Sequence, residues 1–209
     1  IAAVEVRQSR HGRLTVHLSE PADLPPPWQS TPDRLHWYVP TTMDVDDLGP
    51  LTGEVDPPYP LLVTLGHADT GELWLLNCEE IGVLRLTGDL VMGRNLARHV
   101  VAQLAVNPWS ACVKVDCIGL GRELTALGDG IRYREAGEAD TAITEMLAEA
   151  IATVDRAPDS GMDVATARTG QADIDLWPGR LLLLDTTDSS THPSLRELRR
   201  LVTDQTGHT

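Results

Sequence analysis

The sequence predicts a three-layer α/β fold with a central, mainly parallel sheet and an N-terminal β extension packed on its edge or face. From residue 61 onward, strand-sized apolar runs alternate with helical patterns, which is typical of a parallel sheet with helices on its faces. Before residue 61, short segments alternate apolar and polar residues, as strands do. We therefore expect two parts: a β hairpin, extension and Pro-rich connector in residues 1–60, and the α/β domain in residues 61–209.

Composition narrows the classes of function. Of the 209 residues, 42% are hydrophobic and 23% are charged, which excludes a wholly disordered chain. The 17 basic and 31 acidic residues give a net charge of −14, which disfavours binding to DNA or to anionic membranes. No apolar run reaches the roughly 18 residues of a membrane span. The three cysteines favour reduced thiols in the cytoplasm, and the start at Ile1 indicates a fragment of a longer protein.

The first elements should be strands. Val4 and Val6 alternate with polar residues, as do Leu14 and Val16, and the turn signal of residues 9–12 between them predicts a hairpin.

Further strands are expected beyond that hairpin. Leu35–Val39 is a short strand candidate, and an acidic connector rich in Pro and Gly runs from Asp44 to Pro60. Leu61–Leu65 and Leu73–Leu76 should form two strands around a polar turn, and Val83–Leu86 a third.

From about residue 95 onward the sequence predicts helices as well as strands. A helix is expected over about Asn95–Ala105, ended by Asn107 and Pro108, and strands over Val113–Ile118 and Ile131–Arg134.

The clearest helix is expected over Asp140–Val154, with Asp140 as its N-cap. A strand at Arg180–Leu184 and a last helix from Pro193 complete the order. The apolar stripe of the clearest helix comprises Ile143, Met146, Leu147, Ala150, Ile151 and Val154.

The most informative segment is the junction Gly88–Asn95. It has the frame G-x-x-x-x-G-K-[ST] of a phosphate-binding loop between a strand and a helix. Arg94 follows Gly93 in place of the lysine that reaches the terminal phosphates, and Asn95 replaces the hydroxyl that binds magnesium. Asp89 places a carboxylate where a polyphosphate would lie. The segment therefore predicts a degenerate nucleotide site that persists as a turn, with Arg94 at the helix start.

The order of segments resembles the motor domain of the FtsK/SpoIIIE DNA translocases and the related type VII secretion ATPases. Leu65–Asn77 matches the strand pair before the phosphate loop, Thr87–Asn95 the loop, and Asp116–Gly119 the strand end after the helix. The resemblance implies a RecA-like P-loop fold. It also implies that Asp185 is the magnesium-coordinating carboxylate and that Thr186 replaces the catalytic Glu.

A second resemblance concerns the Pro-rich lead-in of residues 20–28 and the phrase Asn107–Ser110. Both are similar to C-terminal regions of large actinobacterial membrane-anchored proteins that carry LysM or bacterial-transcriptional-activator modules. This resemblance implies a place within a multidomain chain.

Loss of the Lys, Ser/Thr and Glu together predicts a non-catalytic, pseudo-ATPase domain, without cofactor or metal, because phosphoryl transfer depends on positioning and charge stabilisation. Such a domain would be a scaffold or regulatory module that binds a protein partner or other domains of its chain. We expect Arg94 to pair with Asp116 or Asp185. One alternative is weak nucleotide binding through Arg94 and Asp185. Another is a DNA-associated transcriptional regulator, suggested by Arg196, Arg199 and Arg200.

The seven histidines show no metal-ligand spacing. His17 and His36 lie in expected strands that could bring them close together, and the roles expected for them are surface or partly buried, hydrogen-bonded ones rather than a metal site.

Overall fold

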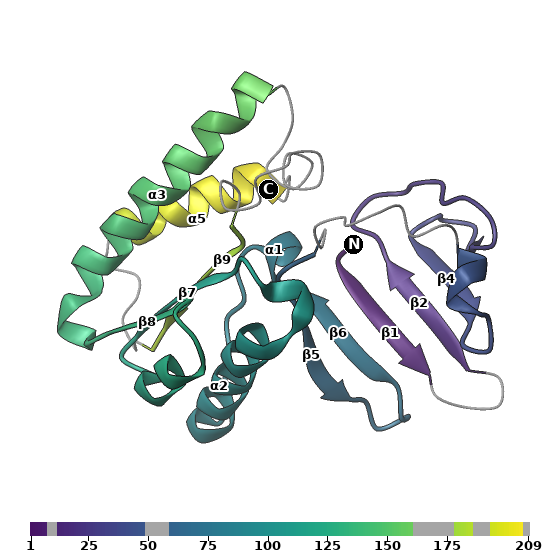
Figure 1. Cartoon of the computed structure of the whole chain (residues 1–209), viewed down its shortest axis with the longest axis horizontal. Coiled ribbons are helices and arrows are strands. Elements are labelled where there is room, and N and C mark those ends of the chain that lie inside the picture. The colour runs from purple at the N-terminus through teal and green to yellow at the C-terminus, as the bar shows by residue number, and fades with distance from the viewer. Residues whose placement is uncertain (8–11, 49–58, 161–177, 186–192, 207–209) are drawn as a thin grey trace. The chain divides into compact units, whose positions relative to one another are not determined.

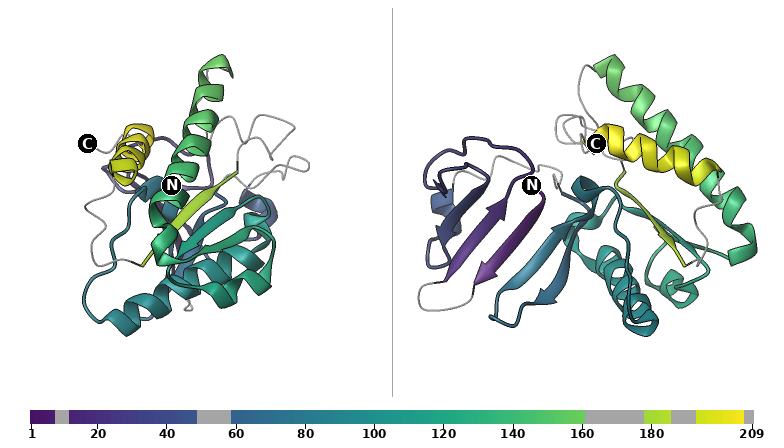
Figure 2. Two further views of the ribbon diagram at one scale, coloured as in Figure 1. Left: turned by 90° about the vertical axis from the view of Figure 1, so that its left-hand side faces the viewer. Right: turned by 180° about the vertical axis from the view of Figure 1, so that it is seen from behind.

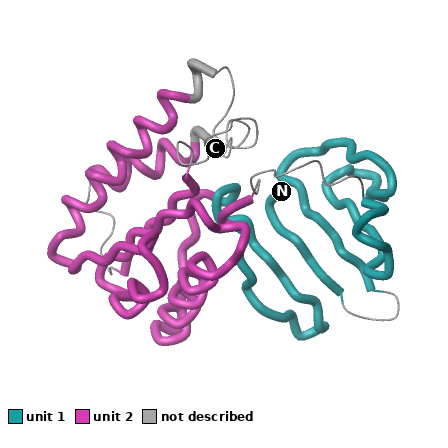
Figure 3. Tube along the Cα trace, in the orientation of Figure 1, with its two compact units in different colours: residues 1–55, 62–81 teal, residues 56–61, 82–209 magenta. Residues whose placement is uncertain are grey.

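The computed structural model describes residues 1–7, 12–48, 59–160, 178–185 and 193–206. The chain divides into two compact units, one of residues 1–55 and 62–81 and one of residues 56–61 and 82–209 (Figure 3). This division differs from the boundary expected at residue 60, because the strand of residues 73–77 pairs with the first strand and brings the strand of residues 62–67 into the N-terminal sheet.

Unit 1 is built on one antiparallel sheet of six strands in the order β3-β4-β2-β1-β6-β5 (Figure 1). A short α1 and a 3₁₀ turn, η1, accompany the sheet. The elements are β1 (Ala3–Arg7), β2 (Arg13–His17), β3 (Gln29–Ser30), β4 (His36–Pro40), η1 (Val45–Leu48), β5 (Leu62–His67), β6 (Leu73–Asn77) and α1 (Cys78–Ile81).

The strands expected in this region are confirmed, apart from small shifts at their ends. β1 and β2 pair with Val4 opposite Val16, although the turn expected between them at residues 9–12 lies almost wholly outside the described residues. β5 and β6 are joined by a tight turn in which Gly71 has φ +92, a conformation that favours glycine. A connection this short forces antiparallel pairing, since parallel strands need a long crossover.

One face of the sheet carries the core of unit 1. Val16, Trp37 and Val39 are buried there, and the indole Nε1 of Trp37 donates a hydrogen bond to the carbonyl of Arg34 at 3.1 Å. The buried aromatic ring therefore has its polar atom satisfied, as a core tryptophan requires.

Unit 2 contains a parallel sheet of three strands in the order β8-β7-β9. Asp116 of the central strand lies opposite Arg132 on one side and Leu182 on the other. Its elements are α2 (Leu90–Val106), η2 (Pro108–Ser110), β7 (Lys114–Ile118), η3 (Arg122–Leu127), β8 (Ile131–Arg134), η4 (Ala136–Glu138), α3 (Ala139–Ser160), β9 (Arg180–Leu184) and α5 (Pro193–Thr206).

Helices lie on both faces of this small sheet, α3 and α5 on one and α2 on the other (Figures 1 and 2). Ile118 of β7 and Ile143 of α3 are almost completely buried in the α3 and α5 layer, with Leu195 of α5 beside them. The apolar stripe expected on α3 is confirmed in its first turns, whereas Ile151 is 39% exposed. The stripe thus contributes to the core only where α3 lies over the sheet.

α3 does not use the expected N-cap. Asp140 lies inside the first turn, and the chain enters the helix through η4. There Glu135 and Glu138 form a capping box, with the backbone N–H of Glu135 donating to the Glu138 carboxylate at 3.0 Å. Glu135 caps the helical segment in place of Asp140, because η4 extends that segment toward the N-terminus.

The fold class expected from the sequence is wrong. Most strands belong to an antiparallel sheet, and only three form the parallel one, so the chain is not a RecA-like, mainly parallel three-layer domain. Two local features explain the difference. β6 pairs with β1 and brings β5 into the same sheet, and residues 83–86, expected as a strand, form no strand at all.

Candidate functional site

The residues of the predicted phosphate loop do not form a loop. Gly88 lies just before α2 with φ +102, and the helix begins at Leu90, so Gly93, Arg94 and Asn95 are helical. A helical backbone turns its N–H groups along the axis and cannot wrap a phosphate chain between the two glycines. The expectation of a surviving turn with Arg94 at the helix start is therefore corrected.

Asp89 determines where this helix begins. It is the N-cap, and its Oδ1 accepts hydrogen bonds from the backbone N–H groups of Val91 at 2.8 Å and Met92 at 2.9 Å. These are donors that an anion at a helix N-terminus would use. A phosphate approaching this end would have to displace a carboxylate of the same charge.

Arg94 is held by a second carboxylate. Its Nε donates to Oδ2 of Asp185 at 3.0 Å, and its Nη2 lies 2.9 Å from the same oxygen. Asp185 follows the carboxyl end of β9 and its side chain is 19% exposed, while that of Arg94 is 43% exposed. The expected pairing of Arg94 is thus confirmed for Asp185. The two groups proposed to contact phosphate and magnesium neutralise each other.

Asp116 has a different partner. Arg132 of the neighbouring strand holds it with both ends of the guanidinium, Nε to Oδ1 at 2.8 Å and Nη2 to Oδ2 at 2.9 Å. Asp116 is 4% exposed, so this pair satisfies a buried carboxylate. Its hydrogen bond to Asp116 raises the pKa of Arg132 above the ordinary value.

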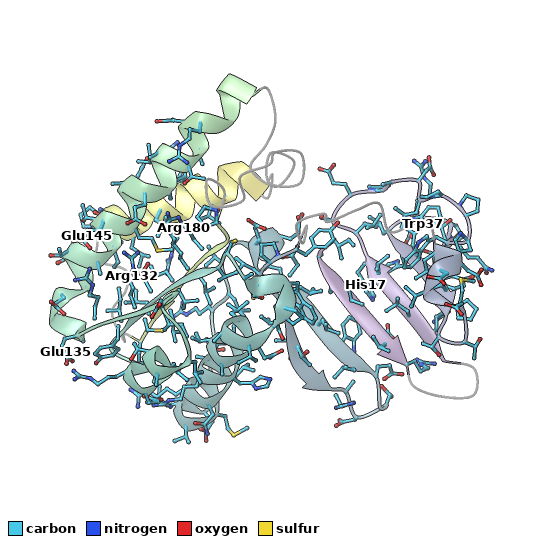
Figure 4. The ribbon with its side chains drawn as sticks, in the orientation of Figure 1. His17, Trp37, Arg132, Glu135, Glu145 and Arg180 are labelled. Atoms are coloured by element: carbon cyan, nitrogen blue, oxygen red, sulfur yellow. The ribbon has the colours of Figure 1, made fainter. Side chains whose placement is uncertain are left out.

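The network of charged side chains extends from Asp116 and Arg132 toward α3. Glu149 lies 3.6 Å from Nη2 of Arg132 and accepts a hydrogen bond from Nη1 of Arg180. Burial acts to raise the pKa of Glu149, but the charges of Arg180 and Arg132 outweigh it and lower that pKa. Figure 4 shows Arg132 and Arg180 beneath α3, the helix that carries Glu145. The sequence analysis did not find this network. Strand alternation was the available signal, because it sets Asp116 and Arg132 on one face.

The other residues predicted for a site give no further support to a nucleotide or DNA site. Asn95 is exposed on α2, and Thr186, expected in place of a catalytic Glu, lies outside the described residues. Of the basic cluster proposed for DNA, Arg200 is paired with Glu197 at 2.6 Å.

An exposed segment rich in large apolar side chains leads into α2, and the sequence analysis missed it. We call residues 83–92 the apolar segment. Leu90 lies seven residues before the buried Ala97, on the same helical face, yet it is 57% exposed. The large hydrophobic residues exposed in this segment are Val83 (45%), Leu84 (51%), Leu86 (39%), Leu90 (57%), Val91 (65%) and Met92 (68%).

Unit 1 carries a histidine pair, as expected. The rings of His17 and His36 meet edge to face with centroids 4.9 Å apart, and Trp74 lies 5.0 Å from His17 on its other side. Nε2 of His17 is 3.6 Å from the Glu5 carboxylate and makes no hydrogen bond within the described residues. Burial, followed by the nearby His36, lowers the pKa of His17.

No metal centre is present in the part of the chain that the structure describes. No group of His, Cys, Asp and Glu side chains there could hold a metal ion. The cysteines are free, and burial raises the pKa of the Cys78 and Cys117 thiols to about 11. Both thiols are therefore protonated and unreactive near neutral pH.

Among the described helices, none combines the length and the hydrophobicity needed to cross a bilayer. Comparison with protein-family models, curated proteins and solved structures finds no match to this chain. The resemblances to the FtsK/SpoIIIE motors and to the actinobacterial proteins therefore stay predictions from the sequence.

Proposed function

We propose that this chain is a non-catalytic interaction module, a scaffold or regulatory part of a larger protein, and that it binds a protein partner through the apolar segment. The exposure of six large hydrophobic side chains within residues 83–92 carries this proposal. Monomeric proteins rarely leave a continuous apolar surface to water unless it binds something.

The absence of catalysis is proposed from two carboxylates, that of Asp89 at the start of α2 and that of Asp185 after β9. Asp89 occupies the free N–H groups that would bind a phosphate, and Asp185 occupies Arg94. Phosphoryl transfer needs exactly placed positive groups on the transferred phosphate. Here those groups are already paired within the chain.

The partner's chemistry is argued from Arg85. This exposed arginine lies between the exposed Leu84 and Leu86 and forms no ion pair with any residue that the structure describes. In a chain of net charge −14, it is a cation beside apolar side chains that none of the described acidic residues pairs with. We infer a partner surface that combines apolar side chains with a carboxylate, since interface cores are apolar and their charges are complementary.

A cytoplasmic location belongs to the same proposal. It is supported by the free thiols of the three cysteines, because a reducing compartment keeps such thiols from oxidation.

Site-directed photo-cross-linking in cells that make the full-length protein tests the proposal. A photoreactive residue at Leu84 or Val91 should capture one and the same protein. The same residue at Ala148 or Ala152, exposed on α3, should not. Arg85→Glu should weaken capture from Val91 because it repels the partner's carboxylate. Equal capture from α3, or no capture from either position in the apolar segment, would contradict the proposal.

A further inference from the structure

β9 is an edge strand of the parallel sheet, and one side of its backbone pairs with nothing that the structure describes. At the two ends of its ladder with β7, the carbonyl of Gly179 accepts a hydrogen bond at 2.8 Å and the N–H of Asp185 donates one at 3.1 Å. Backbone groups alternate sides from one residue of a strand to the next, so the odd-numbered residues of β9 bond to β7. The N–H and C=O groups of Arg180, Leu182 and Leu184 therefore point away from β7, and we call them the free edge.

The free edge lacks the features that protect most edge strands from pairing with another chain. Leu181–Leu184 is an uninterrupted run of leucines, without a charge, a proline or a bulge. The opposite edge of the same sheet, β8, carries Arg132 and Arg134, and β5, at an edge of unit 1, has a bulge between Thr64 and Gly66. Among the longer edge strands that the structure describes, β9 is thus the unprotected one.

β9 is also more accessible to water than the strand beside it. Val115, Cys117 and Ile118 of β7 are at most 1% exposed, whereas every residue of β9 is only partly buried. Leu182 and Leu184 pack against the α3 and α5 layer, and helices cover both faces of the sheet (Figure 2). The remaining exposure of these leucines therefore lies at the outer side of β9, where a further strand would cover it.

The free edge is complementary to itself. A two-fold axis at Leu182 sets this residue opposite its own copy, and sets Arg180 opposite Leu184 of the second copy. Antiparallel residues that face each other exchange both of their N–H···O bonds at alternate positions, so this register pairs every N–H and C=O of the free edge. It also places leucines beside leucines on both faces of the sheet. A two-fold contact of this kind is the commonest arrangement of homo-oligomers.

We propose that two copies of this chain associate through the free edge, so that β9 pairs antiparallel with β9 of the second copy and the two parallel sheets join into one. The contact does not use the apolar segment, and it does not require the proposed protein partner. The net charge of −14 on each copy opposes association at long range. The dimer should therefore become tighter when added salt screens that repulsion.

Sedimentation equilibrium and hydrogen exchange of the 209-residue chain test the proposal. In reducing buffer at physiological ionic strength, sedimentation should show a monomer–dimer equilibrium and gives its Kd. Exchange is run in a dilute and in a concentrated sample, quenched, and read by NMR. The amides of Leu182 and Leu184 should exchange rapidly in the dilute sample and about tenfold more slowly where about a tenth of the chain remains monomeric. The amides of Leu181 and Leu183, bonded to β7, should exchange slowly in both samples.

Two substitutions at one position separate the backbone contact from the side chain. Arg180→Pro removes an N–H of the free edge, at a position where an edge strand tolerates proline. It should raise the Kd of the dimer by about tenfold or more, because each copy loses a hydrogen bond across the contact. Arg180→Ala loses the same side-chain contact with Glu149 but keeps the N–H, so it is the matched control and should dimerise as the unchanged chain does.

Four results would overturn the proposal. Sedimentation could show only monomer at every concentration, or the two variants could have the same Kd. The chain could dimerise while the amides of Leu182 and Leu184 still exchange rapidly, which would place the contact elsewhere. Both amides could exchange slowly in the dilute monomer, which would show that another part of the same chain covers the free edge. Exchange is measured on the unchanged chain, so the test stays valid if Arg180→Pro does not fold.

Discussion

Nε of Arg94 lies 3.0 Å from Oδ2 of Asp185, and this contact joins the second turn of α2 to the carboxyl end of β9. That end of a parallel sheet is where α/β proteins place their ligands. Here an internal ion pair lies across it, and Asp89 occupies the adjacent helix N-terminus. The carboxyl end of the sheet is therefore electrostatically satisfied without a ligand.

The two arginine–aspartate pairs of unit 2 should differ in their contribution to stability. Arg94→Met should lower the free energy of unfolding by less than about 1 kcal/mol, because both partners reach solvent. Arg132→Met should lower it by about 3 kcal/mol, because it leaves the carboxylate of Asp116 buried and uncompensated. Urea unfolding of the two variants measures both values. Equal losses would contradict the assignment of Asp116 as the buried partner.

The cap of α2 gives a second prediction. Asp89→Ala should destabilise the protein by about 1 kcal/mol, because two backbone N–H groups lose their acceptor. Asp89→Asn keeps an acceptor oxygen and should lose only a fraction of that amount. Thermal unfolding measures the difference, and an Asn variant as unstable as the Ala variant would show that the side chain is not the cap.

Gly130 should not tolerate a side chain. A Cβ at this position would lie 2.7 Å from the carbonyl oxygen of Val113, so Gly130→Ala should cost about 1–3 kcal/mol through forced movement of the backbone. Gly128 has no atom within 4 Å of such a Cβ and provides the matched control. Denaturant unfolding should show a clear loss for Gly130→Ala and a smaller change for Gly128→Ala. The reverse order would contradict the close approach before β8.

His17 should make unit 1 sensitive to acid. Burial lowers its pKa in the folded state, so below pH about 6.5 the unfolded chain takes up a proton that the folded chain does not. The stabilisation is complete above that pH and is lost as the pH falls toward and through the lowered pKa.

His17→Gln isolates this effect, because it removes the titrating group while Glu5 and His36 remain. The loss of stability as the pH falls below about 6.5 should become shallower in the variant. An unchanged slope would assign the loss to other groups.

Local patterns predicted much of the secondary structure. The apolar stripe of α3 and the alternation in β1 and β2 are set by neighbours in the sequence, and they are observed. Residues 83–86 have the composition of a strand, but a strand also needs a partner, and no local signal reports whether one exists. The pairing of β6 with β1 joins segments far apart in the sequence, so the antiparallel sheet could not be inferred from either segment alone.

The candidate site was also predictable only in part, because local patterns do not report which distant segments meet. The sequence predicted that Arg94 would pair with Asp116 or Asp185, and the structure shows the pair with Asp185. The helix was expected to begin at about Asn95, because Gly88 and Gly93 indicated a phosphate loop. It begins at Leu90, since Asp89 caps it.

Thermal unfolding with and without millimolar Mg·ATP tests the central claim, that the start of α2 is closed to nucleotides by Asp89 and Asp185. The account predicts the same midpoint in both conditions for the unchanged chain. A ligand present at a hundredfold excess over its Kd would stabilise the folded chain by about 2.7 kcal/mol. A magnesium-dependent rise in the midpoint that disappears in Arg94→Ala would contradict the account.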